Sequence, residues 1–472
     1  MAGRTRRRTP DPRLPVRAGR ILRVRTIWIL PIVVGSVAVA IMTALYIGSV
    51  VNPVAHLRGL PVAIVNQDLG ATVGPRHLDI GQQVQAGLLA SPVVSSKLGL
   101  TVSTLPQAQQ AMDRDGLYAA LVIPPGFTAS LLNVAGLPVP GAAASTAPHV
   151  VILSNVRAGT TGSSLATGVL QPALAVASRQ IGKQLSALVP PAALTGATRV
   201  LLADPVTVTT AQYRPLPPNS ALGLSPFYVA LLTLLCGFIG GTIVNSAVDS
   251  ALGYSTSEVG TRWRQRLPLP INRWQTLLVK WTIVVVLTVV MTGVMLLVAV
   301  AGLGLDAPYP GLLWVFTWLC AASVGIGVIA LFAMAGSFGQ LIALLLFVYA
   351  GLASAGGTVP LEALPQPLRA LSYVEPLRQV LAGTRSIMFF DAQGVAGLTR
   401  GTVAAGAGLV IWLVLGAVVV TWYDRRRLYR LDPDVLDHVT KAAQEYRAQQ
   451  ATGRPPGGKN ADESPGDGVL AT

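Results

Sequence analysis

Long apolar segments alternate with polar ones along this chain, and the first apolar segment, residues 27–51, contains no ionisable side chain. A helix needs ~20 apolar residues to cross a bilayer core of ~30 Å, so this segment can span a membrane. It is longer than the ~7–15 apolar residues of a signal peptide, which favours an uncleaved anchor. Five later segments share its character, and the six predicted transmembrane helices are residues 27–51, 222–244, 277–303, 312–335, 341–355 and 398–422.

Basic residues beside these segments predict the topology of the chain. Nine arginines precede the first span, within residues 1–26, and the tail after the last span opens with further arginines. The segment between the second and third spans is also basic, whereas the next link carries Asp306 and no basic residue. Basic residues near span ends stay in the cytoplasm, so we predict a multi-pass protein of the cell (plasma) membrane with both termini cytoplasmic. The cytoplasmic tail, residues 423–472, has a disordered composition from about residue 452.

Residues 52–221 have a different pattern, which predicts an extracytoplasmic α/β domain inserted between helices 1 and 2. Short β-branched segments bounded by turn formers alternate with helix-like segments. Such alternation indicates βαβ units and a mainly parallel or mixed sheet with helices packed on it. The predicted strands are residues 61–68, 100–105, 117–124 and 149–155, and the predicted helices are residues 80–90 and 106–115.

A long helix is predicted after the fourth strand, with Leu174, Ile181, Leu185 and Leu188 on one face. That face either packs on the domain or pairs with another copy or a partner. The segment 206–219 is rich in proline and predicts an extended return to the membrane.

After the fifth span, residues 356–397 carry two apolar stripes at helical spacing, separated by Pro376. They predict two short outer amphipathic helices that lie at the membrane interface or dip into it.

Composition excludes several classes of protein. Of 472 residues, 52% are hydrophobic and only 12% are charged, which is too apolar for a soluble protein of this size. The net charge of +15 comes from arginines beside apolar segments, which indicates topology signals and contact with membrane lipid rather than nucleic acid. Cys236 and Cys320 lie inside apolar segments, so they predict neither a disulfide framework nor a zinc site.

The usual catalytic and cofactor motifs are absent from the sequence. It contains no phosphate-binding Gly-x-x-x-x-Gly-Lys-Ser/Thr motif and no His-Glu-x-x-His motif, so no catalytic residue, cofactor or metal is predicted. Asp113 and Asp115 are interpreted as a solvated turn. The predicted spans contain few charged side chains, and Lys280 lies near the cytoplasmic end of its span, where it can snorkel to water. A proton- or sodium-coupled carrier is therefore disfavoured, and a separate ATPase is the expected source of energy.

Two places remain as candidate binding sites. Arg262, Trp263, Arg264 and Arg266 form either a cytoplasmic dock for a partner or a plain topology signal. Asp68 follows the first strand, where it caps a turn or contacts a ligand at the carboxyl end of the sheet.

Several motifs resemble those of the YhgE/Pip family, which is related to the type-2 ABC exporter permeases. They are PVAIVNQDLGA at residues 61–71, LDIGQQV at 78–84 and RDGLYAALVIPPGFTASL at 114–131. The order of one span, a large outer domain and five further spans is also similar. Gln67 departs from the family, which usually has an acidic residue there, and the long coiled-coil insertion of many members is missing. The resemblance implies that residues 222–422 are a type-2 ABC permease-like membrane domain without a catalytic residue.

Three functions stay open at this point. The first is a permease-like subunit that exports an amphipathic or hydrophobic substrate, as a homodimer with a separate ATP-binding cassette subunit. The second is a non-transporting envelope scaffold or surface receptor that acts through the extracytoplasmic domain. The third is a secondary drug-efflux pump.

Overall fold

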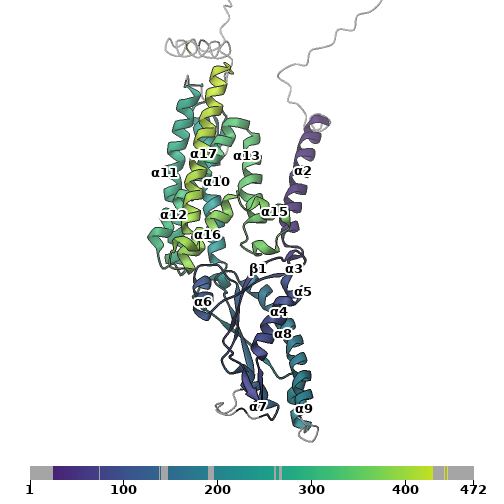
Figure 1. Cartoon of the computed structure of the whole chain (residues 1–472). Coiled ribbons are helices and arrows are strands. Elements are labelled where there is room, and N and C mark those ends of the chain that lie inside the picture. Colours follow the sequence, from purple (N-terminus) through teal and green to yellow (C-terminus); the bar gives the residue numbers. More distant parts are fainter. Residues whose placement is uncertain are drawn as a thin grey trace, which may run out of the picture.

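The computed structural model describes residues 25–73, 75–137, 139, 147–189, 196–259, 262–264, 268–269, 271–428, 441 and 444. Within them, an α/β domain lies at one end of a bundle of long helices (Figure 1). The chain enters this domain from the first long helix, α2 (Arg25–Val50), and leaves it into α10 (Ser225–Ala251). The mostly helical architecture with several apolar helices agrees with the expected fold class.

The helix bundle is built around α12 (Pro310–Ala335), which contacts α10, α11 (Arg273–Leu296) and α17 (Leu398–Arg425). Small residues permit these contacts. A Cβ atom on Gly237 of α10 would lie 2.5 Å from the carbonyl oxygen of Ala321, and one on Gly325 would lie 2.7 Å from Val284. Glycines at such positions let the backbones of neighbouring helices approach closely, as expected for helices that pack within lipid.

Among the residues that the structure describes, five helices are long and apolar enough to cross a membrane: Pro31–Val50, Ser225–Ala251, Arg273–Gly302, Pro310–Ala335 and Leu398–Arg425. The sequence predicts six spans. The remaining segment, Phe338–Ser354, is shorter, and it consists of α13 (Phe338–Ala343), the π-helical η4 (Leu344–Tyr349) and α14 (Ala350–Ser354). Its role as a sixth span stays a prediction.

The two amphipathic helices are present as α15 (Gln366–Leu371) and α16 (Pro376–Phe389). α16 packs inside the bundle, against α10, α12 and α17, and most of its side chains are buried. A Cβ atom on Gly383 would lie 2.1 Å from the ring of Phe316 on α12, so the two helices are in close contact. The apolar stripe of α16 is therefore covered by protein, and the position of this helix relative to the membrane interface stays a prediction.

The sheet of the α/β domain has five strands in the order β4-β1-β5-β6-β7. The pairs β1/β4, β1/β5 and β6/β7 are parallel, and β5/β6 is antiparallel, so the sheet is mixed as expected. The strand bounds are Leu60–Asn66 (β1), Leu98–Val102 (β4), Ala119–Ile123 (β5), His149–Ser154 (β6) and Thr207–Gln212 (β7). The segment predicted as an extended return to the membrane begins with β7, which adds a strand to the sheet.

Alternate residues of the central strands enter two separate cores, because successive side chains of a strand point to opposite faces. Ile64 and Leu121 pack with the helices of one face, whereas Val65 and Met112 pack on the other face. The helices are α4 (Ile80–Ala90), α5 (Pro92–Ser95), α6 (Leu105–Asp113), α7 (Phe127–Val134), α8 (Thr160–Leu188) and α9 (Gly196–Ala203).

The face of α8 that was predicted to pack or pair is largely internal. Leu174, Ile181 and Leu185 are buried in the core of the domain, and only Leu188 remains exposed. This face therefore packs on its own domain. The domain also contains the short helix α3 (Pro53–His56) and a hairpin formed by β2 (Ala71–Val73) and β3 (Arg76–Leu78).

Candidate functional site

Asp68 follows β1 and is held by the protein itself. Its carboxylate accepts hydrogen bonds from the backbone N–H groups of Gly81 and Thr128, both at 3.2 Å, and from the Thr128 hydroxyl group. The Asp68 side chain is buried, and its hydrogen bonds join the end of β1 to the first turns of α4 and α7. These contacts are those expected of a residue that fixes a turn, and contact of Asp68 with a ligand stays a prediction.

The predicted dock forms part of a short hairpin between α10 and α11. β8 (Ser257–Val259) pairs in antiparallel orientation with β9 (Arg262–Arg264), which includes Arg262, Trp263 and Arg264. Arg266 lies outside the described residues. The hairpin follows the end of α10 that is remote from the α/β domain, so the structure does not bring the dock and Asp68 together (Figure 1).

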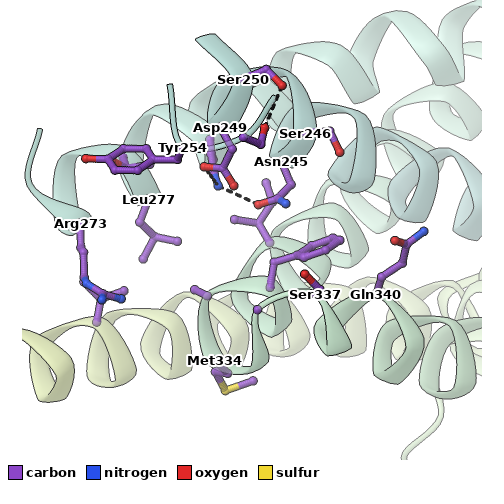
Figure 2. Close-up of a pocket in the computed structure, with 18 of the residues that line it drawn as sticks. Asn245, Ser246, Asp249, Ser250, Tyr254, Arg273, Leu277, Met334, Ser337 and Gln340 are labelled. Atoms are coloured by element: carbon purple, nitrogen blue, oxygen red, sulfur yellow. Dashed lines mark hydrogen bonds and ion pairs between the residues drawn. The ribbon is translucent and has the colours of Figure 1, made fainter. Parts of the chain in front are cut away.

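A pocket of about 800 Å³ opens at this same end of the bundle, between the ends of α10, α11, α12 and α17. Figure 2 shows polar side chains of α10 and of the turn after α12 pointing into it. The polar and charged residues that line the pocket include Asn245, Asp249, Tyr254, Arg273, Lys280 and Gln340.

A buried ion pair forms one wall of this pocket. The Lys280 Nζ atom lies 2.8 Å from Oδ1 of Asp249 and donates a hydrogen bond of 2.7 Å to Oδ1 of Asn245. Lys280 is 5% exposed, so the prediction that it snorkels to water is wrong. The reason is that α10 continues past Val244 to Ala251, which places an acidic residue opposite the lysine.

Arg273 stands at the first turn of α11, on another side of the pocket. Its Nη2 atom donates a 2.6 Å hydrogen bond to the Leu428 carbonyl oxygen, and its guanidinium lies 5.2 Å from the centre of the Tyr423 ring. The aliphatic and aromatic side chains of Ile329 and Phe332 line the pocket from α12. The pocket therefore combines charged, hydroxyl and apolar surfaces.

A second cluster of charges joins the α/β domain to the bundle. Arg385 of α16 lies 3.5 Å from Asp115, and Arg214 links Asp113 at 3.1 Å to Asp391 at 3.7 Å. Burial raises the pKa of Asp115 to about 6, although Arg385 opposes the rise. Asp115 is therefore not part of a solvated turn, and no local pattern could have indicated this, because its partner is far away in the sequence.

Glu375 is a buried carboxyl group at the start of α16. Its Oε2 atom accepts a 3.1 Å hydrogen bond from the Arg378 N–H group, and Oε1 has no hydrogen-bond partner among the described residues. Burial raises the pKa of Glu375 to about 7, against the effect of the Leu377 and Arg378 N–H groups.

Comparison with known proteins assigns the chain to a family. The model of the ABC-2 family transporter proteins matches residues 23–423, which include both the α/β domain and the bundle. The chain belongs to the ABC-2 transporter family. This ABC-2 protein is also similar to a solved domain assigned to an ABC type-2 transporter from Thermotoga maritima MSB8, with 19% identity and a TM-score of 0.23 over 35% of this chain and 97% of that chain. No curated protein matches it.

Membership of the ABC-2 family supports a transport role in a multi-pass membrane protein. ABC-2 permeases generally work with an ATP-binding subunit, and a non-transporting scaffold is not favoured. Placement within the YhgE/Pip family stays a prediction. The sequence pattern does not indicate Asn245 and Asp249 as site residues, because the predicted second span ends at Val244. In the structure, the helix continues to Ala251.

Proposed function

We propose that this ABC-2 protein is the membrane subunit of an exporter that moves an amphipathic or hydrophobic substrate and is driven by a separate ATPase. In this proposal both termini are cytoplasmic and the α/β domain faces the exterior. The observation that carries it is the pocket between α10, α11, α12 and α17, in which charged and apolar surfaces meet. Membership of the ABC-2 family supports the transport role.

The hairpin of β8 and β9 is the proposed dock for the ATPase. It extends the chain from the end of α10 that also forms the pocket, because Tyr254 and Thr256 line the pocket directly before β8. Contact at the hairpin would therefore reach the pocket through a few residues of chain. Arg262, Arg264 and Arg266 supply positive charge suited to an acidic surface of the ATPase.

Co-purification tests the dock. The tagged full-length chain, extracted from its native membrane, is expected to retain an ATP-binding cassette subunit, and the triple change of Arg262, Arg264 and Arg266 to Glu is expected to lose it. The matched control changes Arg179, Lys183 and Arg199 to Glu, three exposed basic residues of the α/β domain. Equal recovery of the ATPase with both triple variants would show that the hairpin is not the dock.

A transport assay in cells distinguishes the proposed ATP-driven export from secondary efflux. Export by cells should stop when the ATPase gene is deleted and should continue for as long as ATP lasts when an uncoupler collapses the proton gradient. The reverse pattern, loss with the uncoupler and survival without the ATPase, would contradict an ATP-driven exporter.

A further inference from the structure

The α/β domain contains a cavity of its own, the α4–α8 cavity, with a volume of about 440 Å³. Residues of α4 and α5 line it on one side and residues of α8 on the other. Val84, Leu88, Val94 and Ile181 form its inner wall, and these buried side chains belong to the apolar core of the domain. The cavity is therefore an opening in the surface of that core.

The α4–α8 cavity is long and narrow. Its lining residues on α8 recur at steps of three and four from Val169 to Gln184, so the cavity follows one face of that helix. At ~1.5 Å per residue, this part of α8 is ~22 Å long. A volume of about 440 Å³ over that length suits one extended hydrocarbon chain. A helix of another protein, ~10 Å across with its side chains, is too wide to enter.

The lining of this cavity favours an uncharged ligand. Among the described residues that line it there is no Asp, Glu, His, Lys or Arg. The residues of the α/β domain outside the described ranges are Gly, Pro, Ala, Ser, Thr and Leu, and none of these types is ionisable. A charged group that entered the cavity would lose hydration without gaining a counter-charge, which is costly in free energy.

Amide groups and exposed apolar side chains meet at the mouth of the cavity. Gln83 of α4 and Gln180 and Gln184 of α8 line it and are exposed. Their amides can both donate and accept hydrogen bonds, which suits an ester or a hydroxyl group. Val93 and Val176 also line it and are 68% and 49% exposed, so a bound chain would remove apolar surface from water.

The position of the cavity favours the membrane as the source of its ligand. The core that forms its inner wall also packs against Leu45 and Val50 at the end of α2. α2 is long and apolar enough to cross a membrane, and most of its side chains are exposed. Figure 1 shows α4, α5 and α8 on the side of the α/β domain that α2 enters. A lipid beside α2 is therefore close to the core in which the cavity opens.

We propose that the α4–α8 cavity binds one hydrocarbon chain of an uncharged membrane lipid, with the ester or hydroxyl groups of that lipid at Gln83, Gln180 and Gln184. This lipid site goes beyond the proposed export function, because it requires neither the ATPase nor transport. It depends only on the position of α2 in the membrane.

Photolabelling of the full-length protein in phosphatidylcholine nanodiscs tests the proposal. The probe is a monoacylglycerol with a diazirine in its chain, and labelled peptides are quantified by mass spectrometry. An excess of unlabelled monoacylglycerol should reduce the labelling of α4 and α8 but not that of α2, whose exposed side chains meet bulk lipid. Dodecyl phosphate and dodecyltrimethylammonium at the same excess should not compete, because each carries a charge.

A substitution that fills the cavity provides the decisive variant. Gly87 of α4 lines the cavity, and a Cβ atom there would have no atom within 4 Å. Gly87→Leu should reduce the labelling of α4 and α8 about tenfold, as expected when about two CH₂ groups of the lipid lose their place in the cavity.

Gly168→Leu is the matched control for Gly87→Leu. Gly168 is exposed on α8, also has open space at its Cβ position, and is not among the lining residues. This variant should be labelled like the wild type. Both variants should melt no lower than the wild type, since leucine is a better helix former than glycine, so unfolding would not explain a loss of labelling.

The outcomes separate the lipid site from the proposed function. Equal labelling of the wild type and Gly87→Leu, or equal competition by charged and uncharged amphiphiles, overturns the site. In native membranes, photoreactive benzoylphenylalanine in place of Val93 should crosslink to lipid, and a crosslink to a protein instead assigns the cavity to a partner and also overturns it. The exporter stands in each case if the ATPase is retained and export continues. Labelling as expected without a retained ATPase leaves the lipid site and removes the ATP-driven mechanism.

Discussion

Buried and partly buried charges in this protein lie where different elements meet. Lys280 and Asp249 join α11 to α10, Asp115 joins the α/β domain to α16, and Glu375 begins α16. An isolated buried charge is expensive in free energy, so each must be paired, hydrogen-bonded or neutralised by a proton. Asp249 is paired with Lys280, and Asp115 is paired with Arg385. Among the described residues Glu375 has no such cation, so protonation contributes most to keeping it buried.

The stability of the protein should therefore depend on pH through Glu375. Its pKa of about 7 in the folded state lies above its ordinary value of 4.5, so the folded state keeps the proton as the pH rises. Its stabilising contribution is present below about pH 4.5 and is lost as the pH rises to 7, a change of about 3 kcal/mol. Glu375→Gln keeps an acceptor for the Arg378 N–H group and should remove this loss.

Thermal unfolding in detergent between pH 4.5 and 8 measures the effect. The wild type should lose stability across this interval relative to Glu375→Gln, and the variant should be the more stable protein at pH 8. Asp306→Asn, at an exposed carboxylate, serves as the control and should follow the wild-type curve. Parallel curves for the wild type and Glu375→Gln would contradict the buried proton.

Breaking the ion pair of Lys280 and Asp249 should destabilise the protein, whereas replacing both residues together should cost less stability. Lys280→Met leaves the buried Asp249 without its cation and should cost about 3–5 kcal/mol of unfolding free energy. The double variant Lys280→Met with Asp249→Asn removes both charges and should recover more than half of that cost. A double-mutant cycle on thermal unfolding measures the coupling between the two residues. Additive effects of the two substitutions would mean that the residues are energetically independent and would contradict the prediction.

At the scale of elements, α16 depends on glycine for its place between α12 and α17. A side chain at Gly383 would overlap the ring of Phe316, whereas a Cβ atom at Gly406 of α17 would have no atom within 4 Å. Gly383→Ala should therefore lower the melting temperature because either Phe316 or α16 must move. Gly406→Ala should leave it unchanged or raise it, since alanine is the better helix former by ~1 kcal/mol. Similar melting temperatures for the two variants would show that α16 is loosely packed.

The elements that could be predicted from the sequence are those with a strong local pattern. β1, β5 and α4 were found because buried parallel strands are continuously apolar and α4 has a regular apolar face. β7 was missed because it is an edge strand that is largely exposed and so lacks the buried apolar residues of the central strands. The burial of α16 could not be predicted, since a stripe of leucines at helical spacing looks the same whether lipid or protein covers it.

The candidate site was predictable only in part, for a related physical reason. The hairpin was singled out by its arginines, but the Lys280–Asp249 pair depends on the length of α10, and helix ends are the least certain feature of an apolar pattern. Asp115 and Arg385 are 270 residues apart, so only the tertiary fold brings them together.

At the scale of the whole molecule, the α/β domain lies at one end of the bundle (Figure 1), and the residues that line the pocket belong to the helix ends remote from it. If the bundle crosses the membrane as proposed, the two ends face different compartments. In a background with Cys236 and Cys320 changed to Ala, Val200→Cys in the α/β domain should react with a membrane-impermeant maleimide on intact cells. Asp424→Cys, at the end of α17, should react only after lysis. The opposite result would invert the proposed topology.

α2 stands apart from the long helices of the bundle and contacts the rest of the membrane segments through α14 and η4 (Figure 1). Its apolar side chains are exposed along most of its length, among them Ile32, Val37 and Ile47. If α2 crosses the membrane as proposed, few protein contacts restrain its tilt, and tilt responds to the thickness of the bilayer. Because only a short link separates α2 from β1, a thicker or thinner membrane would pull directly on β1, which pairs with both β4 and β5 in the sheet.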